Sequence, residues 1–115
     1  MGFDTIAAKA VIRFRLTHPD CRLHLIIPCK NQSERWSDRQ RSMYDYTLFA
    51  ADTVRFLSEE YTDNCMRRRN AELAKLSDIV IAYVGRESSG AGQTVRFAKA
   101  EGKRVYNLYP TLEKN

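Results

Sequence analysis

The sequence has no long run of apolar residues. No segment approaches the roughly 20 consecutive apolar residues that a membrane-spanning helix needs. The N-terminus also lacks the basic segment and apolar stretch that mark a secretory signal. We therefore expect a cytoplasmic protein without a membrane partner.

Cysteine and histidine are scarce, and neither is arranged for chemistry. The cysteines Cys21, Cys29 and Cys65 are odd in number and form no CxxC pair, so we expect neither a disulfide framework nor a metal site. His18 and His24 belong to no Ser-His-Asp or Cys-His pattern. We read the cysteines as reduced thiols, and no catalytic residue and no certain cofactor are assigned.

The remaining composition is that of an ordinary globular protein, with 43% hydrophobic and 29% charged residues among 115. This length predicts a single domain spanning residues 1–115. The net charge is +5, and several arginines stand in groups. Phosphate-bearing ligands and nucleic acid are plausible partners. The simpler interpretation, that an arginine only solvates a helix face, is favoured for Arg13, Arg15, Arg39 and Arg41.

Helical and strand patterns alternate along the chain. Short apolar runs predict strands over residues 22–27, 53–57, 79–84 and 104–108. Apolar spacing and capping residues predict four helices. The first is capped by Asp4 or Thr5 and ends at about residue 17, and the second is capped at Ser37-Asp38 and ends at about residue 51. The third is capped by one of residues 62–64 and ends at about Leu76, and the fourth runs from Gln93 to Glu101 with Gly102 as C-cap. The alternation predicts the α/β class, with a mainly parallel sheet of about four strands.

The same spacing predicts which faces are buried. We expect Ile6 and Phe14 in the first helix, and Met66, Leu73 and Leu76 in the third, to face the core. The segment 79–84 is the most continuous apolar run, which is typical of a central parallel strand covered on both faces.

In a parallel sheet, the segments that follow the strands emerge on one rim, and this rim carries a Gly-rich segment, residues 88–94. Free backbone N–H groups and the positive end of a helix dipole would face a ligand there. Ser89, Gly90, Gly92 and Thr94 are the candidate phosphate-binding residues. The spacing is neither that of dinucleotide folds nor that of P-loops, so an ordinary Gly-rich connection stays open as the alternative.

Four further residues stand near the same rim. Arg69 could bind phosphate bidentately, and Asn70 could bridge backbone groups of adjoining loops. Arg67 and Arg68 fit a solvated basic turn better than Arg69 does. Trp36 could stack on a base and Gln32 could hydrogen-bond one, but Trp36 could equally serve only in packing.

Most of the chain resembles a known family. The segments GFDTIAAKAV, LIIPCKNQSERW, RRRNAELAKLSDIVIAYVG and SGAGQTVRFAKAEGKRVYNL resemble the YpsA-like branch of the SLOG superfamily. The superfamily is Rossmann-like and includes the DNA-processing protein A domain, which binds single-stranded DNA, and the Lonely Guy phosphoribohydrolases. The resemblance implies a three-layer sandwich and a nucleotide or nucleotide-derived ligand, with no assigned reaction.

The resemblance also assigns residues to the ligand site. It places Gly2 and Asp4 in the first ligand turn, Gln32 and Trp36 in the second, and Arg69, Asn70 and the segment 90–94 around the phosphate.

The sequence departs from the family in two respects. Members usually carry an upstream strand, so we expect an N-terminally incomplete SLOG domain whose exposed sheet edge favours a homo-oligomer. Lonely Guy enzymes have a Glu shortly after the Thr of their loop, whereas Val95, Arg96 and Phe97 follow Thr94. We therefore do not expect phosphoribohydrolase activity.

The leading hypothesis is a module that binds a nucleotide-type ligand and acts as a sensor. Two alternatives stay open. One is an enzyme that hydrolyses a nucleotide N-glycosidic or phosphate bond, which rests on fold resemblance alone. The other is single-stranded DNA binding, which the net positive charge favours.

Overall fold

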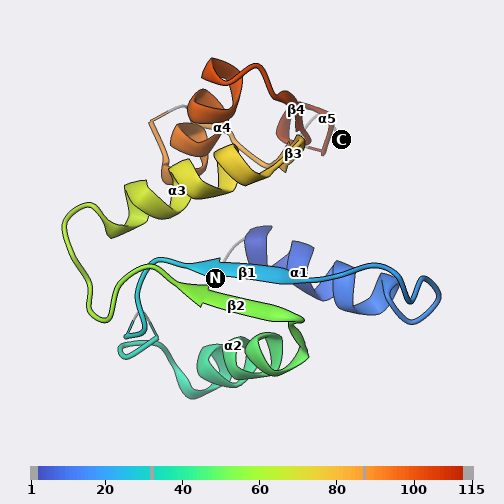
Figure 1. The fold of residues 1–115 in the computed structure, drawn as a ribbon, viewed down its shortest axis with the longest axis vertical. Coiled ribbons are helices and arrows are strands. Elements are labelled where there is room, and N and C mark those ends of the chain that lie inside the picture. The colour runs from blue at the N-terminus through green and yellow to red at the C-terminus, as the bar shows by residue number, and fades with distance from the viewer. Residues whose placement is uncertain (1–2, 32, 87, 113–115) are drawn as a thin grey trace. The chain divides into compact units, whose positions relative to one another are not determined.

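The computed structural model describes residues 3–31, 33–86 and 88–112, and the protein has the predicted α/β class (Figure 1). The chain divides into two compact units, Met1–Thr62 and Asp63–Asn115. The first unit contains two helices and two strands in alternation. The second repeats that order and adds one short helix.

The first unit contains α1 (Phe3–Phe14), β1 (His24–Ile27), α2 (Asp38–Ala50) and β2 (Thr53–Phe56). β1 and β2 pair in parallel, from His24 opposite Thr53 to Ile27 opposite Phe56. The predicted start of α2 is confirmed. Ser37 and Gln40 form a reciprocal capping box, in which Ser37 Oγ accepts from the Gln40 amide at 3.2 Å and Gln40 Oε1 accepts from the Ser37 amide at 3.1 Å.

Asp52 ties together three elements of the first unit. Its Oδ2 accepts from the backbone amide of Leu23 at 2.7 Å and from Nη1 of Arg15 at 2.9 Å. Arg15 also donates to the carbonyl oxygen of Ala50 at 2.8 Å. The end of α2 and the residue that precedes β1 are thereby joined to the arginine that follows α1. The interpretation of Arg15 as a solvating residue is wrong, because its guanidinium is held in this ion pair.

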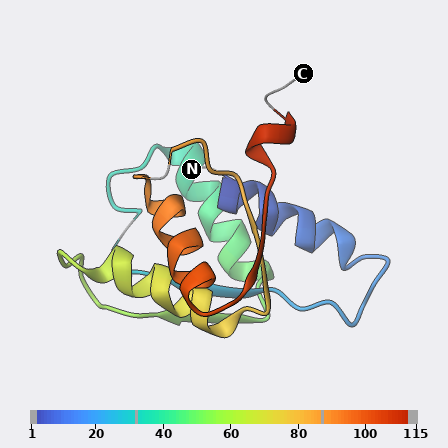
Figure 2. The same ribbon diagram turned by 90° about the horizontal axis from the view of Figure 1, so that it is seen from above.

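The second unit contains α3 (Cys65–Leu76), β3 (Ile79–Ala82), α4 (Gly90–Ala100), β4 (Arg104–Asn107) and the short α5 (Tyr109–Leu112). β3 and β4 pair in parallel, and α3 lies beside α4 in both views (Figure 2). Gly102 follows α4 with φ of +75°, and the Lys103 amide donates to the carbonyl oxygen of Ala98 at 2.9 Å. Only glycine adopts this φ without strain, so the predicted helix stop is confirmed.

The four predicted parallel strands are present as two pairs. Among the described strands, β3 forms a ladder with β4 alone. Ile79 and Ile81, on one face of β3, are 54% and 62% exposed, whereas Ala82 on the other face is buried. The expectation that β3 is covered on both faces is therefore wrong. A continuous apolar run does not reveal by itself which face packing elements cover.

The predictions of which residues face the core in α1 and α3 are also wrong. In α3, Met66, Leu73 and Leu76 are 41%, 37% and 60% exposed, and the buried residues are the smaller Cys65, Asn70 and Ala74. In α1, Ile6 and Phe14 are exposed and Ala8 is buried. Small side chains at a contact allow elements to approach closely. This explains why the larger apolar side chains lie outside these contacts.

None of the helices in the described part of the chain is long and apolar enough to cross a membrane.

Candidate functional site

The Gly-rich segment forms the first turn of α4. The helix begins at Gly90, three residues before the predicted Gln93, because Ser89 caps it. Ser89 Oγ accepts from the Gly92 amide at 3.0 Å and donates to the carbonyl oxygen of Arg86 at 2.7 Å. A serine cap offsets part of the low helix propensity of glycine. The predicted loop at this position is therefore a helix start.

The first amides of α4 are oriented to attract an anion. The first four N–H groups of any helix have no acceptor within the helix. In α4, the Gly92 amide donates to Ser89 Oγ, and the amide of Ser89 itself donates to the carbonyl oxygen of Arg86 at 3.1 Å. Gly90 and Ala91 contribute the other two amides at the positive end of the helix dipole.

Asn70 holds this turn from α3. This residue is only 4% exposed. Its Nδ2 donates to the carbonyl oxygen of Gly90 at 3.2 Å and to Oε1 of Gln93 at 3.1 Å. Its Oδ1 accepts from Nε of Arg69 at 3.0 Å, which places that guanidinium next to the same turn. Asn70 therefore links α3 to one backbone group at the start of α4 and does not bridge adjoining loops as predicted. Ligand binding by Arg69 and Asn70 stays a prediction.

Arg67 makes a second link between the two helices. Its guanidinium lies 5.4 Å from the centroid of the Phe97 ring of α4, in a cation–π arrangement. The interpretation of Arg67 as part of a solvated turn is therefore incomplete, because this arginine also helps to hold α3 against α4.

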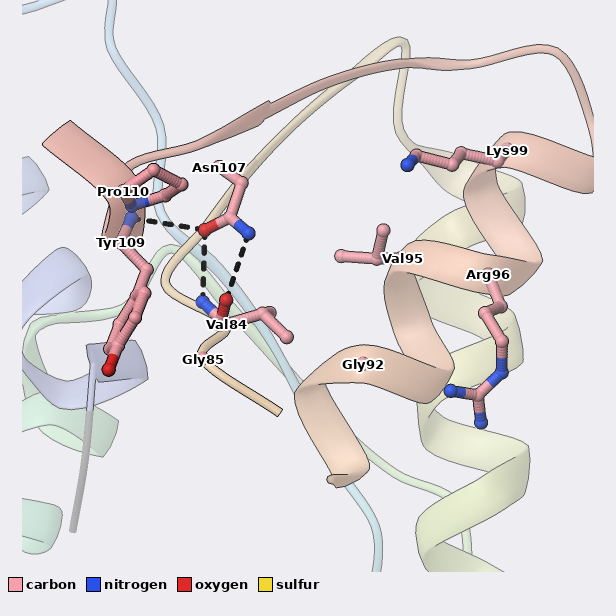
Figure 3. A pocket seen from close by; sticks show the side chains of 9 residues that line it. All are labelled: Val84, Gly85, Gly92, Val95, Arg96, Lys99, Asn107, Tyr109 and Pro110. Atoms are coloured by element: carbon pink, nitrogen blue, oxygen red, sulfur yellow. Dashed lines mark hydrogen bonds between the residues drawn. The ribbon is translucent and has the colours of Figure 1, made fainter. Parts of the chain in front are cut away.

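A cavity of about 340 Å³ lies within the second unit, between α4 and the ends of β3 and β4 (Figure 3). Gly92, Val95, Arg96 and Lys99 line it from α4. The opposite wall consists of the residues that follow β3 and those at and beyond the end of β4, namely Val84, Gly85, Asn107, Tyr109 and Pro110. Because Gly92 belongs to the first turn of α4, the cavity adjoins the start of that helix.

Asn107 fastens the wall opposite α4. Its Oδ1 accepts from the amides of Val84 at 3.0 Å and Tyr109 at 3.1 Å, and its Nδ2 donates to the carbonyl oxygen of Val84 at 2.9 Å (Figure 3). These bonds use both polar atoms of the side chain, so Asn107 positions the wall. The ring of Tyr109 lies directly against Gly85, where an added Cβ would stand 2.7 Å from ring carbon Cε2.

The cavity is electropositive. None of its nine lining residues is acidic, and Arg96 and Lys99 are both cationic. Residues 63–115 hold ten Lys and Arg against six Asp and Glu, so this part of the chain carries +4 of the net +5. An anionic ligand suits this part of the chain better than a cationic one.

The structure brings together six of the residues predicted to bind the ligand. All six lie in the second unit, within the first two turns of α3 or α4 or directly before α4, namely Arg69, Asn70, Ser89, Gly90, Gly92 and Thr94. The hydroxyl of Thr94 donates back to the carbonyl oxygen of Gly90 at 3.4 Å. Its proton is therefore directed along its own helix.

The other four predicted residues do not belong to this cluster. Asp4 and Trp36 lie in the first unit, and Gly2 and Gln32 lie outside the described residues. Asp4 is inside the first turn of α1, where its Oδ1 accepts from the adjacent Thr5 amide at 2.9 Å. The prediction that Asp4 or Thr5 caps this helix is therefore wrong, because both residues lie within α1.

Trp36 packs on α2. Its ring meets that of Tyr44 edge to face at a centroid distance of 5.2 Å. Arg41 donates to the backbone oxygens of Trp36 and Glu34 at 3.2 Å and 3.1 Å and so fixes the loop before α2. This geometry matches the packing interpretation of Trp36. It also shows that Arg41 binds the backbone in addition to facing solvent.

Of the residues that line the cavity, sequence reasoning predicted only Gly92 as a site residue. The polar and charged residues that it missed are Arg96, Lys99, Asn107 and Tyr109. A signal for the first two is present in the sequence, because positions four and seven after Gly92 share its helix face. Asn107 and Tyr109 end or follow the last strand, at the rim where ligand-binding segments were expected. Their own side-chain partners are set by tertiary contacts that no local pattern predicts.

Across the described residues, no group of three or more His, Cys, Asp or Glu side chains is arranged to hold a metal ion.

Comparison with known proteins gives the family. A UPF0398 protein of Bacillus cereus strain B4264 is 26% identical over 106 residues, which cover 90% of this chain and 58% of the relative. A UPF0398 protein of Bacillus thuringiensis strain Al Hakam matches with the same identity and coverage. The chain thus spans 58% of the length of these curated relatives. The YpsA family model, described as the YspA SLOG family, matches residues 1–111. Because this match takes in nearly the whole chain, the protein belongs to the YspA SLOG family, as its sequence predicts.

Proposed function

We propose that this protein binds a nucleotide or a nucleotide-derived ligand, whose phosphate group lies at the first turn of α4. One observation carries the proposal. Ser89 and Asn70 hold that turn in place, and the turn adjoins an electropositive cavity through Gly92. A fixed set of amides at the positive end of a helix binds phosphate without further rearrangement.

Arg69 would supply the counter-charge. Its Nε is engaged by Asn70, which fixes the plane of the guanidinium near the start of α4. A guanidinium fixed in this way binds a phosphate with less loss of side-chain entropy than a mobile lysine. A sensor role, in which binding sets the output, is part of the same proposal.

The proposal can be tested by titrating adenosine 5′-monophosphate into the protein in a calorimeter. Arg69→Ala should weaken binding about tenfold, the loss expected for one charge-assisted hydrogen bond. Gly92→Val should abolish binding, because it places a branched side chain between the amides and the cavity. Arg68→Ala is the matched control, since Arg68 is the exposed neighbour of Arg69 on α3.

Circular dichroism of each variant separates a loss of binding from a loss of fold. If folded Arg69→Ala and Gly92→Val proteins bind as well as the unmodified chain, the phosphate does not lie at this turn.

Single-stranded DNA is a second candidate ligand, and the concentration of positive charge in residues 63–115 favours it. Binding through phosphate neutralisation weakens steeply as the salt concentration rises. A gel shift of an oligodeoxynucleotide that is lost as the salt concentration rises from roughly 50 to 200 mM would support this candidate. An absent shift at low salt would dismiss it.

A further inference from the structure

Beyond the phosphate at the start of α4, we infer that the base of the nucleotide lies between Val84 and Val95, with one edge toward Lys99. The site then prefers a 6-oxopurine nucleotide, which carries guanine or hypoxanthine, over an adenine nucleotide. This inference rests on the proposed function and adds to it the choice of base.

The wall that α4 contributes to the cavity changes in character along the helix. Gly92, Val95 and Lys99 follow one another on the side of α4 that lines the cavity. The step from Gly92 to Lys99 corresponds to about 10 Å along the helix axis, or roughly two turns. A ligand whose phosphate lies at the first turn therefore meets an apolar side chain next and a cation last. An extended nucleotide presents its phosphate, ribose and base in that order.

Val84 and Val95 form an apolar slot in the middle of the cavity. Figure 3 shows their side chains pointing toward one another, Val84 from the segment that follows β3 and Val95 from α4. Pro110 adds apolar surface to the wall opposite α4. A flat heteroaromatic ring placed between such side chains removes both of its faces from water. The slot is therefore the part of the cavity that best suits a base.

The size of the cavity limits the ligand. About 340 Å³ is near the lower end of the range of roughly 300–1,000 Å³ found for small-molecule sites. Such a volume suits one nucleotide unit and is too small to enclose a dinucleotide.

Lys99 is the cation beside this slot. Figure 3 shows its side chain extending from α4 toward the wall that carries Asn107, whereas the Arg96 guanidinium is turned away from that wall. No described residue gives Lys99 Nζ a hydrogen bond or an ion pair. Its ammonium group is therefore available to donate to a ligand.

The other side chains that line the cavity give a base no free acceptor. Asn107 Oδ1 already accepts from the amides of Val84 and Tyr109. Figure 3 shows the Tyr109 ring directed away from Val95 and Lys99. The nine described residues that line the cavity include no Asp or Glu. The edge of a base that points toward Lys99 therefore meets a donor and no acceptor.

A donor of this kind distinguishes the purines. The edge of a 6-oxopurine that carries O6 and N7 presents two acceptors, and lysine and arginine are the side chains that commonly pair with it. Adenine carries an amino group in place of O6, so the same edge presents one acceptor beside a donor. The Lys99 ammonium group is attracted by both acceptors of an oxopurine, whereas the amino hydrogens of adenine oppose it.

A lysine near the end of a helix also has a simpler explanation, because it interacts favourably with the negative end of the helix dipole. α3 offers the comparison, since Lys75 occupies its last turn as Lys99 occupies that of α4. Lys75 is not among the residues that line the cavity. The two lysines share the dipole effect and differ in their access to the cavity, so Lys75 is the matched control.

The experiment compares inosine 5′-monophosphate with adenosine 5′-monophosphate by calorimetry. Both nucleotides carry the same ribose and phosphate, so the ratio of their affinities reports on the base alone. The unmodified chain should bind the inosine nucleotide about fivefold more tightly, on the order of one hydrogen bond. Lys99→Met should abolish this preference. Lys99→Arg, which keeps a donor, and Lys75→Met should both retain it.

Other results would overturn the inference. If the two nucleotides bind equally, if the adenine nucleotide binds more tightly, or if the preference survives Lys99→Met, then Lys99 does not select the base and the proposed function still stands. If neither nucleotide binds, the proposed function fails together with the inference.

Discussion

The side-chain nitrogen of Asn70 in α3 lies 3.2 Å from the carbonyl oxygen of Gly90, the first residue of α4. Through this bond, a buried amide on one helix fixes the starting turn of the next. The proposed phosphate site therefore depends on a residue that need not touch the ligand. Stability and binding should respond together when Asn70 changes.

Replacing Asn70 by alanine should lower the free energy of unfolding by about 1–3 kcal/mol, because the mutation removes the partner of a polar group that lies in a largely buried contact. Asn70→Asp should cost more, since a carboxylate oxygen would face the Gly90 carbonyl oxygen. Urea denaturation of the three proteins measures both effects. Equal stability of the aspartate variant and the unmodified chain would contradict the assigned donor.

Two substitutions of Ser89 distinguish the effect of helix capping on stability from the effect of local charge on ligand binding. Ser89→Ala should lower the free energy of unfolding by about 1 kcal/mol through loss of the cap. Ser89→Asp should retain stability, because aspartate caps helices well and its charge favours the helix dipole. The same negative charge should weaken adenosine 5′-monophosphate binding roughly tenfold by repelling its phosphate. A stable Ser89→Asp protein with unchanged affinity would argue against an anion at this turn.

The sequence predicted the elements better than their contacts. Strand positions and the stops at Leu76 and Gly102 follow from local residues, and these predictions are confirmed. The start of α4 was placed late because glycines lower helix propensity, and the compensating Ser89 cap was not recognised.

The faces of the helices were harder to predict. Apolar spacing favoured Leu73 and Leu76 as inward residues, but α3 instead buries Asn70 and Ala74. A polar residue can be buried when specific tertiary partners satisfy it, and those partners lie 20 and 23 residues away in the sequence. The cavity residues Asn107 and Tyr109 were missed for the same reason.

A substitution at Gly85 tests whether the Tyr109 ring packs against this glycine in the wall of the cavity. A Cβ at this position would lie 2.7 Å from Cε2 and Cζ of Tyr109, so Gly85→Ala should displace the ring. Because Tyr109 is 37% exposed and its ring can turn aside, the loss of stability should be about 1 kcal/mol, the lower end for an overpacked contact. In a Tyr109→Ala background the ring is gone, so Gly85→Ala should lower the stability much less than it does in the unmodified chain. A double-mutant cycle by chemical denaturation measures the coupling. Additive effects would mean that the two residues do not meet.

Asp52 should make stability depend on acid pH. The Leu23 amide lowers the pKa of Asp52 from 3.8, and Arg15 lowers this pKa further, against the opposing effect of burial. Since the folded protein has the lower pKa, the stabilisation is present above pH 3.8 and is lost as the pH falls through the folded value. Asp52→Asn should be less stable at neutral pH and show a flatter decline in acid. Parallel denaturation profiles for both proteins would refute this.

The most direct test of the phosphate site is an NMR titration of the ¹⁵N-labelled chain with adenosine 5′-monophosphate. The largest shifts in the backbone amide resonances should fall on Gly90, Ala91 and Gly92, and Ser89→Asp should reduce these shifts. If the amides of the first turn of α4 do not respond while resonances elsewhere do, the ligand binds at another place and the proposed site is wrong.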